Sequence, residues 1–272
     1  MCCLFLAASS TVAIAQTSVV DLVNPIIGAN GMGHTFPGAC VPCGLVQLSP
    51  DTDTIPHNVD GKYQPRSYEY CAGYQHKDSS IVGFSHTHFS GTGHSDLGDI
   101  LIMPTTGTLK LNPGTATNPD GGYRSRFSHG TEISRPGYYE VMLADYGVKA
   151  QLTTTQRVGI HKYTYPTNSE NQRIILDMIH GIYNYDGKVL WTNIRVENDT
   201  LVTGYRITNG WARTNYTYVA MSFSKPVVHY GCEAKAKVNY RGGYGKFNMK
   251  ENFPDIGGRK IVAYFDFDPA VS

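Results

Sequence analysis

Short apolar runs that alternate with polar residues dominate the second half of the chain. Side chains of a strand point to its two faces in turn, so this period-two pattern predicts strands with one buried face. No long stretch shows apolar residues at the three- and four-residue spacing of an amphipathic helix. The runs expected to form strands are 101–103, 138–143, 149–155, 159–165, 173–178, 189–197, 201–208, 215–222 and 260–267.

Turn-forming residues separate these runs, for example Asn-Pro-Gly at 112–114, Arg-Pro-Gly at 135–137 and Tyr-Asp-Gly at 185–187. Glycine, proline, asparagine and aspartate supply the backbone conformations that tight turns require. Strands that recur between tight turns predict an all-β fold, specifically a large antiparallel β-sandwich. The first hundred residues are denser in Gly, Pro and Asp, so we expect long N-terminal loops that join a few strands.

The charge balance argues against a nucleic-acid partner. The 272 residues include 23 Lys+Arg and 22 Asp+Glu, and no long basic run or stripe is present. The 19 tyrosines and 29 glycines are typical of a β-rich protein with many turns, and aromatic faces often bind carbohydrate. The length suits one large all-β domain or two ordinary ones.

The N-terminus, MCCLFLAASSTVAIAQ, resembles a secretory signal peptide. The apolar run Cys2–Ala7 is followed by AIA at 13–15, a small-residue pattern typical of a cleavage site. We expect residues 1–15 to be the signal, with a start that lacks the usual basic residues and so fits a truncation, and residues 16–272 to be one domain. The run is too short to span a bilayer, so we expect an exported protein, periplasmic or extracellular, with no membrane partner.

Four cysteines lie beyond this signal: Cys40, Cys43, Cys71 and Cys232. Cys40 and Cys43 have CxxC spacing, which fits redox chemistry or half of a zinc site. A zinc site needs a second close pair, and Cys71 and Cys232 are far apart in sequence. Packed free thiols or a single disulfide, which an exported protein can form, are the interpretation we favour.

The stretch FSHTHFSGTGHSDLGD at 84–99 concentrates groups that could carry chemistry. On a strand, His86 and His88 would share one face and could present two imidazoles to a metal, with His94, Asp96 or Asp99 completing the shell. Imidazoles also bind hydroxyl groups, and glycines let a ligand approach the backbone. Spacing alone leaves open a metal site, a polar sugar pocket, or polar side chains that bond the backbone at a strand end.

A second cluster, NGMGHTFPG at 30–38, places His34 and Phe36 among glycines. No strand–helix–strand frame surrounds it, so a dinucleotide site is not expected and a ligand-facing loop or a structural turn remains. The sequence DTD at 51–53 begins like a calcium loop. Pro56 stands where that loop needs glycine and no glutamate follows at its twelfth position, so we reject a calcium loop here.

Glycoside hydrolysis usually requires two carboxylates placed on either side of the scissile bond. No arrangement in the sequence identifies such an acid and base. The carboxylates considered are Glu69, Asp96, Asp99, Glu132, Glu140 and Asp145.

Four long stretches of the chain, in order, resemble the N-terminal domain of glycoside hydrolase family 92. They are VNPIIGANGMGHTFPG onward at 23–52, CAGYQHKDSSIVGFSHTHFSG onward at 71–105, YRSRFSHGTEISRPGYYE onward at 123–166, and VTGYRITNGWARTNYTYVAMSFSKP at 202–226. The resemblance runs from about Val20 to the end, and is more specific than any single motif above.

The resemblance implies a galactose-mutarotase-like supersandwich, followed in family members by a C-terminal (α/α)6 barrel. Most members are calcium-dependent, exo-acting α-mannosidases that hydrolyse mannosides with inversion, often from N-glycans. The active site lies between the two domains. The helical domain supplies the acid, the base and most of the Ca²⁺ shell. This chain ends where that domain should begin, so the resemblance implies a fragment or a truncated gene product that is inactive alone.

The resemblance also implies which residues face the sugar, and it assigns no catalytic or metal-ligating residue to this chain. Two departures from the family pattern, Cys40 with Cys43 and the absence of a Trp before Cys71, leave linkage preference open; Tyr68 or Tyr70 could replace that Trp. The expected substrate-binding residues are His34, Phe36, Cys71, Gly73, Tyr74, His86, His88 and Asp96.

The expected function is therefore the carbohydrate-binding half of an inverting exo-α-mannosidase. It would contribute a pocket wall and a domain interface, with a mannose-containing glycan and the (α/α)6 domain as partners. One alternative is a standalone carbohydrate-binding module without hydrolytic activity. Another is a complete metal-dependent enzyme built on His86, His88 and Asp96.

Overall fold

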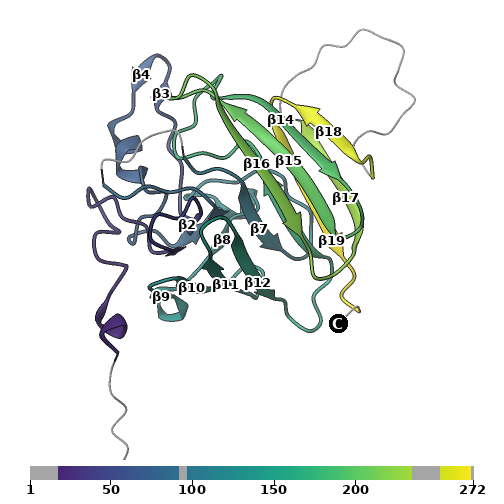
Figure 1. The fold of residues 1–272 in the computed structure, drawn as a ribbon, viewed down its shortest axis with the longest axis horizontal. Coiled ribbons are helices and arrows are strands. Elements are labelled where there is room, and N and C mark those ends of the chain that lie inside the picture. The colour runs from purple at the N-terminus through teal and green to yellow at the C-terminus, as the bar shows by residue number, and fades with distance from the viewer. Residues whose placement is uncertain (1–17, 92–96, 235–251, 271–272) are drawn as a thin grey trace, which may run out of the picture.

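The computed structural model describes residues 18–91, 97–234 and 252–270, and these residues form antiparallel strands with a few short 3-10 helices (Figure 1). In chain order the elements are η1 (Val19–Leu22), β1 (Ala39–Cys40), β2 (Gln47–Asp51), β3 (Asn58–Val59), β4 (Lys62–Tyr63), η2 (Pro65–Tyr70), β5 (Ser80–Ile81), β6 (Gly83–Ser85), β7 (Leu101–Thr105), η3 (Pro119–Gly121), β8 (Ser125–Arg126), η4 (His129–Thr131), β9 (Ile133–Arg135), β10 (Tyr138–Leu143), β11 (Val148–Thr154), β12 (Gly159–Thr164), β13 (Gln172–Asp177), β14 (Val189–Val196), β15 (Leu201–Thr208), β16 (Asn215–Ser222), β17 (Val227–Ala234), β18 (Asp255–Gly258) and β19 (Ile261–Phe267).

A seven-stranded sheet with the order β1-β2-β6-β7-β13-β19-β17 forms the centre of the fold. Its middle strands β7, β13 and β19 are buried along almost their whole length, without the alternation of a half-exposed strand. In β13, Ile174 and Leu176 pack into one hydrophobic cluster, whereas Ile175 packs into the other. The central sheet is therefore covered on both faces.

Two four-stranded sheets provide this cover. The sheet β12-β11-β10-β9 packs Tyr139, Val141 and Leu152 against Ile175 on one side. The sheet β16-β15-β14-β18 packs its apolar residues against the opposite face. Figure 1 shows these layers on the two sides of β7, and burial of each fully enclosed aliphatic side chain contributes about 1.5–3 kcal/mol.

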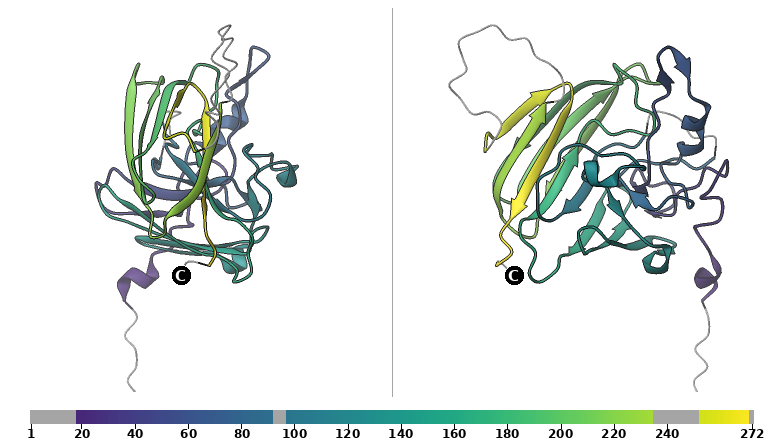
Figure 2. Two further views of the ribbon diagram at one scale, coloured as in Figure 1. Left: turned by 90° about the vertical axis from the view of Figure 1, so that its right-hand side faces the viewer. Right: turned by 180° about the vertical axis from the view of Figure 1, so that it is seen from behind.

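The predicted all-β antiparallel sandwich is confirmed, and β10, β15 and β16 have the predicted bounds. The N-terminal part, purple to blue in Figure 2, consists of long loops and short strands on the side away from β14–β18. The expected signal peptide at 1–15 lies outside the described residues. No helix in the described part of the chain has the length and apolar character needed to cross a membrane.

Candidate functional site

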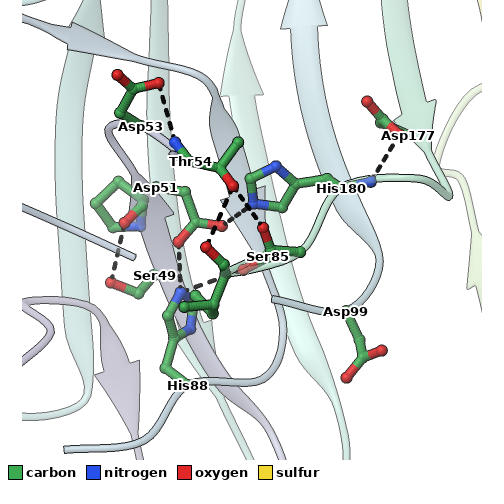
Figure 3. Close-up of polar contacts among 12 residues, drawn as sticks. Ser49, Asp51, Asp53, Thr54, Ser85, His88, Asp99, Asp177 and His180 are labelled. Atoms are coloured by element: carbon green, nitrogen blue, oxygen red, sulfur yellow. Dashed lines mark hydrogen bonds and ion pairs between the residues drawn. The ribbon is translucent and has the colours of Figure 1, made fainter. Parts of the chain in front are cut away.

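Asp51 lies at the centre of a buried polar cluster beside the histidine-rich stretch. It is the last residue of β2, and its side chain is fully buried. Its Oδ1 lies 2.7 Å from Nε2 of His88, and its Oδ2 lies 2.7 Å from Nε2 of His180 (Figure 3). His88 follows β6 and His180 follows β13, so three strands of the central sheet position one carboxylate between two imidazoles.

His88 carries a positive charge in this arrangement. Its Nδ1 lies 2.7 Å from the backbone carbonyl oxygen of Gln47, and its Nε2 faces Asp51. Both partners are acceptors, so the ring satisfies them only with a proton on each nitrogen. Burial alone would raise the pKa of Asp51, but the charge of His88 and hydrogen bonds from both rings outweigh burial and hold that pKa well below its usual range.

Asp177 fixes the loop that carries His180. Its Oδ1 accepts hydrogen bonds from the backbone N–H groups of Ile179, at 2.6 Å, and His180, at 3.0 Å. The hydroxyl of Tyr123 donates to Oδ2 of Asp177 at 2.5 Å. Burial, together with the charge of Asp177, raises the pKa of Tyr123 well above its usual value, so the phenol remains a donor.

Gly73 and Phe36, two residues of the predicted site, lie against this cluster. A Cβ atom on Gly73 would lie 1.9 Å from Oδ1 of Asp51 and 3.1 Å from Nε2 of His88, and φ of Gly73 is +78°. Only glycine fits at such a position. The ring centroid of Phe36 lies 5.3 Å from that of His88. The structure therefore brings Phe36, Gly73 and His88 together.

His34 has a buried ring nitrogen without a partner. Its φ of 52° lies in the left-handed region, and its ring meets that of Tyr68 edge-on, with 4.6 Å between centroids. His34 is 6% exposed, yet Nε2 has no hydrogen-bond partner among the described residues. Buried polar atoms are almost always paired, and strained backbone concentrates at binding sites. The Nε2 atom of His34 is therefore a buried polar atom that the described part of the domain leaves unpaired.

Cys71 and Tyr74 point into the protein. Cys71 is fully buried, with Sγ 3.0 Å from the hydroxyl oxygen of Tyr183. Tyr74 is 1% exposed, and its hydroxyl donates to Glu132. Their predicted contribution to sugar binding, which stays a prediction, would therefore act through the backbone that they position around Gly73.

The expectation that His86 and His88 share one face is wrong. The strand ends with β6, one residue before His86, so period-two alternation does not continue through the two histidines. The ring of His86 contacts His161 of β12, whereas that of His88 contacts the Asp51 cluster. Of the other predicted ligands, His94 and Asp96 lie outside the described residues.

His86 and His161 form a pair of neutral imidazoles. His86 Nδ1 donates to the carbonyl of Ile100 at 2.6 Å, so its Nε2 is an acceptor for Nε2 of His161 at 3.0 Å. Nδ1 of His161 then accepts from the hydroxyl of Tyr163 at 2.7 Å. Burial lowers the pKa of His86 to about 4, and burial with the neighbouring His86 holds the pKa of His161 well below its usual value.

The free energy of unfolding should therefore fall as the pH is lowered from about 6.5 to about 4. In this window the unfolded chain binds protons that the folded His86 does not, so stability present above pH 6.5 is lost. From His86 alone we expect a loss of about 2 kcal/mol between pH 7.5 and pH 5. Urea denaturation at the two pH values measures it.

A matched pair of variants tests whether the two imidazoles cause this loss of unfolding free energy. His161→Gln keeps a donor for His86 and an acceptor for Tyr163 but removes one titrating ring, so the loss between the two pH values should shrink. His57→Gln, at an exposed histidine, should leave it unchanged. Equal losses in wild type and His161→Gln would contradict the neutral pair.

A second buried ion pair joins Arg206 of β15 to Asp99. Nε of Arg206 lies 2.9 Å from Oδ1 of Asp99, and the side chains are 0% and 2% exposed. The contact lacks the geometry of a hydrogen bond, so it is an ion pair by proximity. The guanidinium donates to the carbonyl oxygens of Met178 and His180, and Oδ2 of Asp99 accepts from Thr87 at 2.7 Å. Arg206 thus connects the His180 loop with the segment after β6.

Asp51, His180 and Arg206 were not among the predicted site residues. Each is a polar residue within or beside an apolar run, in VQLSPD, ILDMIHG and VTGYRIT respectively. A charged group in a buried run requires a partner, which is a signal that the sequence does contain. The sequence does not say which partner each group finds.

Comparison with known proteins shows which family this chain resembles. Residues 22–272 match the model of the glycosyl hydrolase family 92 N-terminal domain. A family GH92 α-mannosidase from Bacteroides thetaiotaomicron, solved in complex with mannoimidazole, is 40% identical with a TM-score of 0.78; the match covers 92% of this chain and 30% of that one. An inverting family GH92 mannosidase from B. thetaiotaomicron VPI-5482 shares the fold, with 24% identity, a TM-score of 0.67, and coverage of 94% and 31%.

An uncharacterized secreted glycosidase from Arthroderma benhamiae is 28% identical over 163 residues, which is 57% of this chain and 18% of that protein. The chain thus spans less than a third of the length of these relatives. The family model covers nearly the whole chain, and the likeness at 40% identity extends over most of it. The chain therefore belongs to glycosyl hydrolase family 92, of which it comprises the N-terminal domain.

Proposed function

We propose that this domain forms one wall of the mannose-binding site of an inverting exo-α-mannosidase and part of the interface with a C-terminal (α/α)6 domain. The observation that carries the proposal is the buried Nε2 atom of His34, which has no partner among the described residues and lies on the HTFPG motif two residues before Phe36. A neutral imidazole nitrogen accepts a sugar hydroxyl, and an aromatic ring packs against the apolar face of a sugar.

The substrate class rests on the relatives. The 40%-identical structure is that of an α-mannosidase bound to mannoimidazole. We propose α-mannosides, such as those of N-glycans, as the substrate of the enzyme that contains this domain. The remaining predicted residues act around this site: Gly73 and His88 shape its base, and His86 and Asp96 belong to the same sequence motif.

The acid and base are proposed to come from the helical domain. Inversion requires two carboxyl groups about 6.5–9.5 Å apart, with space for a water molecule. The buried carboxylates near this site are engaged elsewhere: Asp51 with two histidines, Asp99 with Thr87 and Arg206, and Asp177 with Tyr123. In this account the domain binds and orients the sugar, and other residues transfer the protons.

Calcium, which we propose for the intact enzyme, does not fit the Asp51 cluster. Ca²⁺ takes six to eight oxygen ligands, as a rule including carboxylates. The groups next to the two oxygens of Asp51 are ring nitrogens of His88 and His180, so this cluster lacks the set of oxygen ligands that Ca²⁺ requires. Most of the Ca²⁺ ligands are therefore proposed to lie in the helical domain.

Export is proposed as well, to the periplasm or the extracellular space. Two observations support it: the signal-like sequence at 1–15, and the likeness to a glycosidase named as secreted. A mannose-rich glycan outside the cytoplasm is the kind of substrate that such an enzyme would meet.

The isolated chain is expected to leave aryl α-mannosides intact. The measurement is release of the aryl alcohol by the purified chain with calcium and then with EDTA, beside the 40%-identical Bacteroides enzyme as positive control. We expect a rate equal to the buffer blank, because we place the acid and base in another domain. Turnover by the chain that EDTA abolishes would contradict this placement.

A further inference from the structure

Two histidines and a glutamate lie close together next to the segment that carries Gly73. They are His76, which follows this segment, His129, the first residue of η4, and Glu132, which directly follows η4. One ligand atom from each of the three lies within 4.8 Å of the others. The ring centroids of His76 and His129 are 3.9 Å apart. This group of residues is called the His76 cluster below.

Glu132 is held in one orientation. Its side chain is 3% exposed, and it accepts hydrogen bonds from the hydroxyl groups of Tyr74, at 2.9 and 3.0 Å, and of Tyr139, at 2.6 Å. Burial, followed by the charge of Glu132, raises the pKa of both phenols well above the usual value, so both remain donors. A carboxylate fixed by hydrogen-bond donors is the outer-shell support that metal ligands commonly have.

The two imidazoles come from different parts of the chain and are also fixed. The backbone N–H of His76 donates to the carbonyl of Ala29 at 2.7 Å. The ring of His129 meets that of Phe127 edge-on, and its Nδ1 lies 2.7 Å from Oε2 of Glu132. The side chain of His129 is 38% exposed, so the cluster opens to solvent on this side.

We propose that the His76 cluster binds a transition-metal ion of the zinc class. Two imidazole nitrogens and one carboxylate oxygen are a ligand set that zinc accepts, whereas calcium and magnesium prefer oxygen ligands alone. A metal ion bound through Nδ1 of His129 would replace the 2.7 Å contact between this nitrogen and Oε2 of Glu132. The fourth position is open to water from the exposed side.

Such an ion would add a second link between two segments that the hydrogen bond from Tyr74 to Glu132 already joins. His76 lies three residues after Gly73, and η4 leads into the sheet β12-β11-β10-β9. The metal would therefore tie the Gly73 segment to this sheet. This inference does not depend on the proposed mannosidase function.

The exposed Cys40 and Cys43 are the competing zinc ligands in this chain. The four described cysteines beyond the signal are free thiols. A test must nevertheless separate the cysteine pair from the histidines, because thiols bind zinc strongly.

The test is titration of the chelator-treated chain with Co²⁺, followed by its visible absorption, and with Zn²⁺ by calorimetry. We expect one equivalent of each to bind. His76→Gln and His129→Gln should each weaken binding at least about a hundredfold, and Tyr139→Phe about tenfold. The double variant C40S/C43S and the exposed-site control His57→Gln should bind like wild type.

Circular dichroism confirms that each variant is folded, and His129, being exposed, provides a substitution that the fold tolerates. Binding that survives both His76→Gln and His129→Gln, or that disappears in C40S/C43S, would overturn the proposal. So would the absence of a saturable Co²⁺ spectrum in wild type.

Discussion

Asp51→Ala should be the most destabilising single substitution at this site, lowering the free energy of unfolding by about 3–5 kcal/mol. The substitution leaves the imidazolium of His88 buried without its carboxylate, and removes the acceptor of His180. An uncompensated buried charge costs far more than a lost surface ion pair. Urea denaturation at pH 7.5 measures the difference.

A double-mutant cycle isolates the cause. If Asp51 mainly compensates the charge of His88, then His88→Gln should cost at least about 1 kcal/mol less in the Asp51→Ala background than in wild type. Purely additive effects of the two substitutions would show that the two side chains are not coupled, and would contradict the charged state of His88.

Gly73→Ala is expected to lower the free energy of unfolding by about 3 kcal/mol. The added Cβ would lie 1.9 Å from Oδ1 of Asp51, so the carboxylate or the segment must move, at a cost of roughly 1–3 kcal/mol. The positive φ of Gly73 adds about 1–2 kcal/mol for any residue with a Cβ. Denaturation of the variant beside wild type gives the sum.

Gly137→Ala separates these two contributions. Gly137 has φ of +74°, close to that of Gly73, but nothing lies within 4 Å of its added Cβ. The Gly137→Ala variant should therefore lose only the about 1–2 kcal/mol of unfolding free energy that a positive φ costs a residue with a Cβ. Equal losses for Gly73→Ala and Gly137→Ala would mean that the approach to Asp51 is not tight.

The strands of the outer sheets could be predicted because their burial is one-sided. In β10 the alternation of buried and half-buried residues follows the sequence pattern, and its predicted bounds agree with the structure. The short strands β1 to β6 could not be placed, since five of the six have only two or three residues and show no period-two pattern. The strand β17 was not predicted either. Its pairing with β19 shifts register between Val227 and His229.

The motifs indicated Phe36, Gly73 and His88, which the structure brings together at the Asp51 cluster. Their role in sugar binding stays a prediction. The separation of His86 from His88 could not be read from spacing, because it depends on where β6 ends. Long-range partners are set by the sheet order, and periodicity carries no information about them.

The long-range partner in the His76 cluster could not be predicted from the sequence either. His129 and Glu132 are three residues apart and share one turn, a spacing visible in the sequence. His76 joins them only through the packing of the Gly73 segment, which no local pattern predicts. Pairs of ligands can thus be found from the sequence, but complete sites need the fold.

The central claim is that residues 22–272 form the sugar-facing domain of a family 92 α-mannosidase. It is tested most directly by replacing the matching domain of the 40%-identical Bacteroides α-mannosidase with these residues, and measuring hydrolysis of aryl α-mannoside and aryl α-glucoside with calcium. Size-exclusion chromatography and a cooperative unfolding transition establish that the chimaera is folded. We expect a folded chimaera that prefers the mannoside, and a kcat/KM at least about tenfold lower for its Phe36→Ala variant. A folded chimaera without mannosidase activity, or with preference for the glucoside, would contradict the claim.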